Sequence, residues 1–336
     1  MKYKCIDASR DRWIEVAKAC PYATYFHTPY WYELIAPRHR HIATEVKFDD
    51  GASAIIPVAR VKRSRGLLTD HFSAPACTYG GWISADELNK NHVRALTNIL
   101  MSRKNLTFRL NPFDYSQSSL LTVSMPVPQS SVTLMNDVTY VLDLTQGEKE
   151  LHNRSNRGHK EKLRKADRNG ITVREAQSWE EWERYYDLYR QAISRWLSRG
   201  PELTPRNVYP MELFRRLYEN ASGHERFWVA LKDGAVIGGM VCFYWNRHAV
   251  GWHASADAQH FSEGSNNRLY WEIILDAMRN GFEYFDCNPS GGYGGVETFK
   301  EHLGASRVST PVLQTRTPLR LLISRIRGQR PGVSPG

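Results

Sequence analysis

The alternation of apolar and polar positions predicts two short hairpins that lie far apart in the chain. Each hairpin joins two apolar strands through an Asp-Gly pair, at residues 50–51 and at residues 233–234. An Asp-Gly pair supplies the positive φ angles that a tight hairpin turn requires. A third strand, residues 248–256, follows the second hairpin. The pattern therefore predicts antiparallel sheet in both halves of the chain.

Apolar residues at helical spacing predict helices over residues 86–102, 182–196 and 264–281. Residues 7–36 also have helical spacing, in at least two pieces because prolines interrupt them. Residues 66–81 and 116–131 resemble loops.

The two halves repeat one order of features. His-Phe-Ser follows each hairpin, at His71 and at His260, and a later helix and strand lead to Asn-Pro, at Asn111 and at Asn288. Five features in the same order favour duplication over chance, and 336 residues suit two domains. Hairpins followed by helix-strand units predict an α+β (mixed α/β) fold.

The formal net charge of +10 allows two readings, solubility alone or an anionic partner. The five cysteines are scattered and form no C-x-x-C, which argues against a disulfide framework or a zinc site. The N-terminus lacks the apolar run of a signal peptide, and no stretch has the length of a membrane span. We therefore expect a cytoplasmic protein without a bound metal or cofactor.

The densest charge cluster spans residues 153–170. On a helix, Arg157, Lys160, Arg164 and Arg168 share one face, because they step by three, four and four. A solvated helix face usually mixes signs, whereas this face is almost purely basic. The pattern favours contact with phosphate or an RNA backbone over a solvated face, although both readings stay open.

A second candidate region is the glycine-rich loop at residues 288–295, which is followed by Phe299 and Lys300. Glycines let backbone N–H groups approach a ligand, and Lys300 could place a cation beside a developing oxyanion. His253 could take a proton from an attacking amine, or it could be a hydrogen-bonded structural histidine. Cys287 lies in an apolar strand, where a buried thiol is the simpler reading.

These segments resemble the Fem peptidyltransferases (FemABX) and their FemAB-like, BioF2-like relatives in the GNAT superfamily. The match is carried by K-L-R-K-A-D-R-N-G-I-T-V after the basic cluster, by the second hairpin, by the helix and F-D strand ending at residue 286, and by F-K-E-H-L-G at residues 299–304. The matching segments span residues 153–304, and the tandem order extends the similarity to the whole chain.

The resemblance implies two tandem GNAT-like (acyl-CoA N-acyltransferase-like) domains, residues 1–137 with 309–336 packing back onto them, and residues 138–308. It implies transfer of an amino acid from aminoacyl-tRNA to an amine of a UDP- or lipid-linked peptidoglycan precursor, in a cleft between the domains, without a metal or a covalent intermediate. The catalytic candidates are Lys300, Phe299 and His253. The substrate- and phosphate-binding candidates are Arg157, Lys160, Arg164, Arg195, Tyr293 and Asp286.

Two departures from the family pattern bear on function. The family strand continues F-D-x-G-G, whereas this chain has F-D-C-N-P at residues 285–289. The acyl-CoA loop of GNAT proteins is only faintly echoed at residues 259–264, where Glu263 would lie at the pyrophosphate position. Aminoacyl-tRNA is therefore favoured over acyl-CoA as donor, and the acceptor could also be a small amine.

Two alternatives remain. One is an acyl-CoA-dependent N-acyltransferase of cell-envelope or secondary metabolism. The other is a catalytically silent RNA- or membrane-binding protein, because the tail at residues 319–327 alternates leucine or isoleucine with arginine and could contact anionic lipid.

Overall fold

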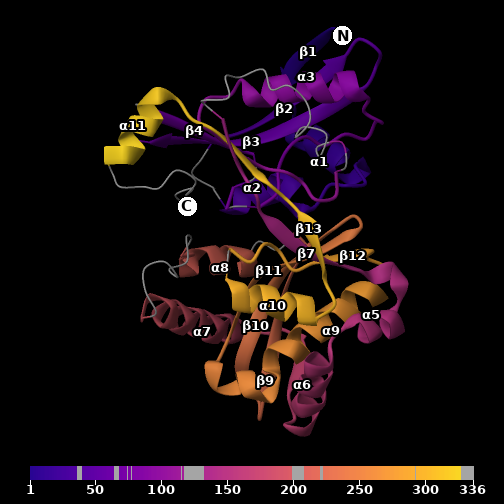
Figure 1. Ribbon diagram of the computed structural model, residues 1–336, viewed down its shortest axis with the longest axis vertical. Coiled ribbons are helices and arrows are strands. Elements are labelled where there is room, and N and C mark those ends of the chain that lie inside the picture. Colours follow the sequence, from indigo (N-terminus) through magenta and orange to yellow (C-terminus); the bar gives the residue numbers. More distant parts are fainter. Residues whose placement is uncertain are drawn as a thin grey trace. The chain divides into compact units, whose positions relative to one another are not determined.

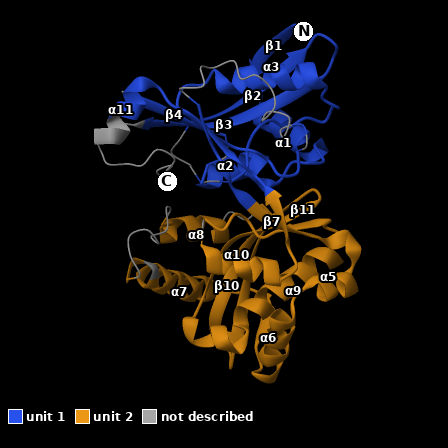
Figure 2. Ribbon diagram, in the orientation of Figure 1, with its two compact units in different colours: residues 1–138, 309–336 blue, residues 139–308 orange. Residues whose placement is uncertain are grey.

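The computed structural model describes residues 1–35, 40–63, 68–73, 75–76, 78–114, 116, 132–198, 208–219, 222–291 and 293–326. The chain forms two compact units (Figure 2). Unit 1 comprises residues 1–138 and 309–336, and unit 2 comprises residues 139–308.

Unit 1 is built on a seven-stranded sheet with the order β1-β2-β3-β4-β5-β14-β6 (Figure 1). Its strands are β1 (Tyr3–Asp7), β2 (Arg40–Phe48), β3 (Ser53–Arg63), β4 (Leu68–Ser73), β5 (Leu106–Arg109), β6 (Val132–Met135) and β14 (Val312–Thr315). Its helices are α1 (Arg10–Ala19), η1 (Tyr25–His27), α2 (Pro29–Ile35), α3 (Lys90–Met101) and α11 (Pro318–Ile326).

Unit 2 is built on a second seven-stranded sheet, with the order β13-β7-β12-β11-β10-β9-β8. Its strands are β7 (Val138–Asp143), β8 (Thr172–Glu175), β9 (Glu225–Lys232), β10 (Ala235–Trp245), β11 (His248–Ala256), β12 (Tyr284–Asp286) and β13 (Ser306–Ser309). Its helices are η5 (Leu144–Gln146), α5 (Glu148–Arg154), α6 (Arg157–Arg168), α7 (Trp179–Ser198), α8 (Met211–Glu219), η7 (Ala258–Glu263), α9 (Ser265–Arg279) and α10 (Gly294–His302).

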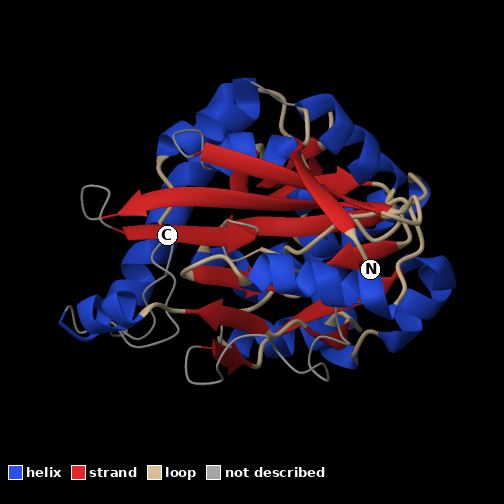
Figure 3. Cartoon of the chain, turned by 90° about the horizontal axis from the view of Figure 1, so that it is seen from above, coloured by secondary structure: helices blue, strands red, loops and turns tan. Residues whose placement is uncertain are grey.

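The two sheets have the same strand order when one of them is read in reverse. Figure 3 shows the strands in red and the helices in blue. The fourth and fifth strands of this order run parallel in each unit, β4 beside β5 and β11 beside β12. The hairpins β2-β3 and β9-β10 are antiparallel. The mixed α+β class and the tandem arrangement expected from the sequence are confirmed.

One strand of each sheet comes from a distant part of the chain. In unit 1, β14 lies between β5 and β6 and pairs antiparallel with both. In unit 2, the corresponding place beside β12 is taken by β7, which begins at the end of unit 1. The C-terminal segment therefore completes the first sheet.

The turn chemistry explains where these elements begin and end. Asp233 and Gly234 both have positive φ, 50° and 79°, as the two-residue turn between β9 and β10 requires. Gly281, with φ 80°, ends α9. The core of unit 1 packs α3 on the sheet through Val93, Leu96 and Leu100, the three positions that the helical spacing predicts.

Two details of the sequence reading were wrong. Strand β4 lies inside residues 66–81, for which the sequence predicts a loop. His-Phe-Ser does not mark equivalent positions, because His71 lies in β4 whereas His260 lies in the 3-10 helix η7. Most of residues 116–131 lies outside the described residues.

Candidate functional site

The parallel strands of unit 2 separate at their carboxyl ends. Pairing between β11 and β12 stops at Val250 and Asp286, while β11 continues to Ala256. The chain after β12 turns to β7, where the Cys287 N–H donates to the Tyr140 carbonyl at 2.8 Å. In open sheets, ligands bind where neighbouring strands diverge at their carboxyl ends, which makes this turn the first candidate site.

Two buried charged side chains hold the backbone of Asn288 at this turn. The Asn288 N–H donates to Asp286 Oδ1 at 2.8 Å, and Lys300 Nζ donates to the Asn288 carbonyl at 2.6 Å. Thr139 Oγ1 also donates to Asp286 Oδ1, at 2.5 Å. Asp286 is 0% exposed and Lys300 2% exposed. Such burial is costly unless each charge is hydrogen-bonded, and both are.

The surroundings of Lys300 are apolar and aromatic. Its ammonium lies 5.7 Å from the centre of the Tyr140 ring. Burial raises the pKa of the neighbouring Cys287 thiol to about 12, although the positive charge of Lys300 acts against the shift. Cys287 is therefore a neutral thiol at physiological pH and not a nucleophile.

Tyr293 and Phe299 belong to α10, the helix that follows this turn. The Phe299 ring packs edge-on against Tyr270 of α9, with ring centres 5.0 Å apart. Tyr293 is the N-cap of α10, and its carbonyl accepts from the N–H groups of Val296 and Glu297. Asp286, Lys300 and Tyr293 thus bind the backbone of the turn, whereas Phe299 packs on α9.

His253 of β11 lies among aromatic rings. The imidazole contacts the rings of Tyr185, Tyr189, Tyr209 and Phe214. Its Nδ1 lies 2.5 Å from the Tyr185 hydroxyl, which also donates to the His253 carbonyl at 2.9 Å. The residue keeps some solvent-accessible surface, but this enclosure lowers its pKa to about 3. His253 is therefore neutral at physiological pH. Among the described residues, no hydrogen bond joins it to the turn at Asn288.

Helix α6 carries the predicted basic face. Arg157 and Arg164 are exposed and Lys160 is half-buried, whereas His159, Leu163 and Ala166 are buried against unit 2. Arg157 pairs with Glu161 at 2.9 Å, and Lys160 Nζ donates to the Asn153 carbonyl at 3.3 Å. The helix begins beside α10, because the Asn156 N–H donates to the His302 carbonyl at 3.0 Å.

Helix α6 also packs against the start of α9. A Cβ atom at Gly264 would lie 2.2 Å from the Lys162 carbonyl oxygen, and Lys162 Nζ donates to the Ser262 carbonyl at 2.8 Å. Glu263 accepts from His260 and Lys232, and these contacts lower its pKa. The Lys162 carbonyl and the Glu263 side chain therefore lie next to Gly264, the N-cap of α9.

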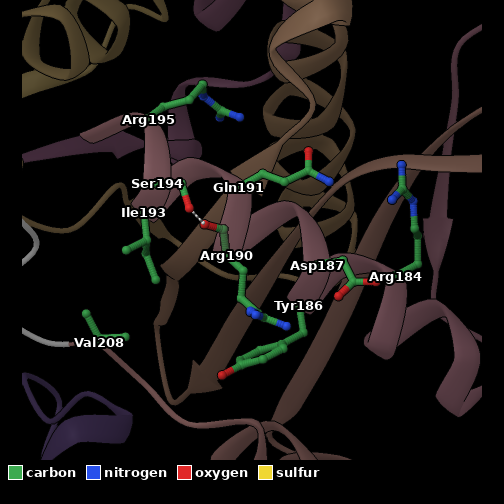
Figure 4. Close-up of a pocket in the computed structure, with 9 residues that line it drawn as sticks. All are labelled: Arg184, Tyr186, Asp187, Arg190, Gln191, Ile193, Ser194, Arg195 and Val208. Carbon is green, nitrogen blue, oxygen red and sulfur yellow. Dashed lines mark hydrogen bonds between the residues drawn. The ribbon is translucent and has the colours of Figure 1, made fainter. Parts of the chain in front are cut away.

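A pocket of about 730 Å³ lies along α7 (Figure 4). Arg184, Arg190 and Arg195 line it together with Asp187. Arg195 Nη2 donates to the carbonyl of Ala256 at the carboxyl end of β11, at 3.4 Å. Three guanidinium groups against one carboxylate give the pocket a net positive charge suited to an anion.

The sequence indicated the loop at residues 288–295 as a candidate region but did not single out Asn288 and Ser290 within it. The signal was present, because Asn-Pro replaces the Gly-Gly of the family pattern at 288–289. Among the residues that the structure describes, no group of three His, Cys, Asp or Glu side chains is placed to hold a metal ion. No helix within the described ranges is long and apolar enough to cross a bilayer.

Comparison with known families places unit 2 in a recognised class. Residues 153–301 match the family model Acetyltransf_6, described as an acetyltransferase (GNAT) domain. Residues 153–301, which make up less than half of the chain, are therefore similar to a GNAT acetyltransferase domain. No curated protein matches the sequence.

Solved structures extend the likeness to both units. The crystal structure of FemX is similar over 96% of this chain and 99% of its own, with a TM-score of 0.68 and 11% identity. A tandem GNAT protein from the clavulanic acid biosynthesis pathway covers 94% of this chain and 99% of its own (TM-score 0.54, 10% identity). L-PGS from Bacillus licheniformis covers 87% and 90% (TM-score 0.51, 14% identity). The resemblance to FemABX-like GNAT proteins is confirmed at the level of domain family and fold.

Proposed function

We propose that this protein is an aminoacyltransferase that moves an aminoacyl group from aminoacyl-tRNA to a primary amine of its acceptor. The GNAT domain supports acyl transfer as the class of reaction. The fold of FemX and of L-PGS supports the search for an aminoacyl donor. Among acceptors, we favour a UDP- or lipid-linked peptidoglycan precursor, with a small amine as the alternative.

The reaction needs little covalent chemistry from the protein. The neutral amine attacks the ester carbonyl, a C–N bond forms, and the C–O bond to the tRNA ribose breaks. The amine loses one proton, and the leaving ribose oxygen gains one. Positioning and stabilisation of the oxyanion supply the catalysis. Lys300 contributes its positive charge at the turn. Phe299, its neighbour in α10, packs that helix against Tyr270 of α9.

The choice of donor rests on the close approach of α6 to Gly264, the N-cap of α9, and on the acidic Glu263 beside it. A pyrophosphate would need the open N–H groups of that helix end. Here the Lys162 carbonyl lies against Gly264, and the Glu263 carboxylate stands next to it with His260 and Lys232 as partners. This arrangement disfavours the pyrophosphate of an acyl-CoA and supports aminoacyl-tRNA.

Two basic surfaces would hold the phosphates. The exposed face of α6, with Arg157, Lys160 and Arg164, suits a tRNA backbone. The α7 pocket, with Arg195 and its neighbouring arginines, suits the phosphate groups of the acceptor. Separate sites for the two substrates fit a reaction that proceeds by direct transfer.

A second candidate is an acyl-CoA-dependent N-acyltransferase, which the acetyltransferase description of the matching family favours. This candidate would place a pyrophosphate beside the Glu263 carboxylate.

The test separates the two donors. Purified protein is incubated with a pool of charged tRNAs or with acetyl-CoA, each with a panel of primary amines, and loss of each donor is measured. We expect amine-dependent loss of aminoacyl-tRNA only. Loss of acetyl-CoA instead would favour the second candidate. Loss of neither donor with any amine, while tRNA still binds, would leave a catalytically silent RNA-binding protein.

A variant pair assigns the activity to the site. Lys300→Met should abolish turnover and retain tRNA binding, whereas Lys90→Met, on the exposed side of α3 in unit 1, should change neither. Unchanged turnover in Lys300→Met would reject Lys300 as part of the catalytic machinery.

A further inference from the structure

The turn at Asn288 contains two buried polar atoms that no other group satisfies. Asn288 Oδ1 and Ser290 Oγ have no hydrogen-bond partner among the residues that the structure describes, and both atoms are shielded from solvent. Ser290 is only 7% exposed. Buried polar atoms in folded proteins nearly always have a partner, so two orphans on one turn indicate an absent ligand or water.

The backbone of Asn288 is held in a conformation that glycine would adopt more easily. Its φ is +62°, in the left-handed region, where a side chain costs free energy. The hydrogen bonds to Asp286 and from Lys300 fix the N–H and the carbonyl of this residue. The conformation is therefore determined by the buried charges, and the Asn288 side chain is free to serve another purpose.

The hydrogen-bonding chemistry of these two unpaired atoms limits the kinds of ligand that could bind them. A side-chain carbonyl oxygen is an acceptor only, so Asn288 Oδ1 needs an N–H or O–H donor. A serine hydroxyl can donate or accept. The pair therefore suits a small group that has an N–H, with a carbonyl oxygen or a second donor beside it. A neutral primary amine about to attack an acyl group has this character.

We propose that Asn288 and Ser290 form the amine subsite of this protein, in which Asn288 Oδ1 accepts an N–H of the acceptor amine and aims its lone pair at the acyl carbon. Ser290 Oγ completes the subsite by hydrogen bonding to the same nitrogen or to the acyl oxygen. Asp286 and Lys300 are positioning residues for this subsite, through the Asn288 backbone. The inference rests on the proposed function, since it names the group that receives its acceptor.

The turn lies close to the surface of unit 2. Asn288 and Pro289 are half-buried and Gly291 is exposed, so the buried atoms lie directly beneath the surface of unit 2. The carboxyl end of β11, where Arg195 binds the Ala256 carbonyl, is the same end of the parallel strand pair. An acceptor with its phosphates near Arg195 would thus have its amine and its anion recognised at one end of the sheet.

The decisive variant is Asn288→Gly, because glycine keeps the positive φ and removes only the side chain. We expect the KM for the amine to rise about tenfold, as for the loss of one hydrogen bond, with the KM for the donor unchanged. Asn288→Asp retains an acceptor oxygen and should retain amine binding. Ser290→Ala should give a smaller rise. Equal KM values in Asn288→Gly and the wild type, or a parallel rise for amine and donor, would overturn the proposal.

A second measurement separates this inference from the proposed function. If the wild type consumes no donor, the proposed function fails, and crystals soaked in methylamine at alkaline pH then test the subsite by itself. We expect the nitrogen within hydrogen-bonding distance of Asn288 Oδ1 in the wild type and not in Asn288→Gly. An empty turn in both, or a protein donor bonded to Oδ1, would overturn the subsite whatever the reaction.

Discussion

The two units end their fifth strands in the same dipeptide, Asn-Pro, and use it in opposite ways. In unit 1, Asn111 is 3% exposed, its Oδ1 accepts from the Phe113 N–H, and its Nδ2 donates to the Tyr22 carbonyl. In unit 2, the backbone of Asn288 is bound by buried charges, and its Oδ1 has no partner among the described residues. Asn111 therefore uses its side chain to stabilise unit 1, whereas the side chain of Asn288 is the one that we propose to bind the amine.

The comparison shows how a duplicated fold can concentrate a site in one copy. Strand order and the parallel pair are the same in both sheets. The differences are the left-handed φ at Asn288 and the lysine that α10 brings to its carbonyl. In unit 1, the neighbouring Leu110 binds instead to the C-terminal segment, through Pro311 and Thr310. In unit 1, the C-terminal segment therefore forms hydrogen bonds with the backbone next to the Asn-Pro turn.

The largest effect should come from the buried charges of unit 2. Lys300→Met leaves the Asp286 charge buried without the nearby cation, so we expect a loss of about 3–5 kcal/mol in the free energy of unfolding. The double variant Asp286→Asn with Lys300→Met should recover most of this stability and none of the turnover. Urea unfolding and donor consumption measure the two quantities. Recovery of both would mean that the charges serve folding alone.

The next largest effect is the difference in stability between variants of the two asparagines. Asn111→Gly removes two buried hydrogen bonds, and we expect it to lower the free energy of unfolding by about 2 kcal/mol with turnover per folded molecule unchanged. Asn288→Gly relieves the strain of a positive φ, so its stability should equal or exceed that of the wild type. Urea midpoints check both. Equal destabilisation of the two variants would remove the contrast between the turns.

The sequence predicted the fold better than the site, and the reason is visible in single residues. Hairpins and amphipathic helices are local patterns, and the Asp-Gly turn at residues 233–234 has the φ angles that its sequence predicts. His71 and His260 share a tripeptide but not a structure, because strand pairing with β3 places His71 in β4. A shared tripeptide is too short to determine whether its residues form a strand or a helix.

The chemical candidates depended on long-range contacts that no local pattern contains. Lys300 is twelve residues from Asn288 in sequence, and its 2.6 Å contact with that carbonyl arises only because α10 folds back on the turn. Thr139 reaches Asp286 across 147 positions. His253 was a candidate base from strand alternation, whereas its aromatic surroundings come from α7 and α8. Its role in proton transfer stays a prediction.

A smaller effect distinguishes the basic helix of unit 2 from an ordinary helix of unit 1. Replacing Arg157, Lys160 and Arg164 by glutamine should weaken binding of uncharged tRNA and reduce the slope of log Kd against log salt by about 2. Lys90→Gln with Arg94→Gln, on the exposed side of α3, is the matched control and should change the slope little. Filter binding at several salt concentrations measures the slopes. Equal slopes for both sets would make the α6 face an ordinary solvated surface.

The smallest effect concerns acid, and it compares one buried histidine from each unit. Burial lowers the pKa of His27 in unit 1 to about 4 and that of His253 in unit 2 to about 3. The unfolded chain binds these protons near pH 6.5, so each histidine makes its unit less stable as the pH falls from there to its own folded pKa. His253→Phe should remove this acid sensitivity down to about pH 3, and His27→Phe only down to about pH 4. Hydrogen exchange measures the stability of each unit at each pH. Taking the difference between variant and wild type removes the contribution of carboxylates that titrate in the same range. If the difference between wild type and His253→Phe is independent of pH, then the aromatic enclosure does not keep that imidazole neutral, and His253 regains its place as a candidate base.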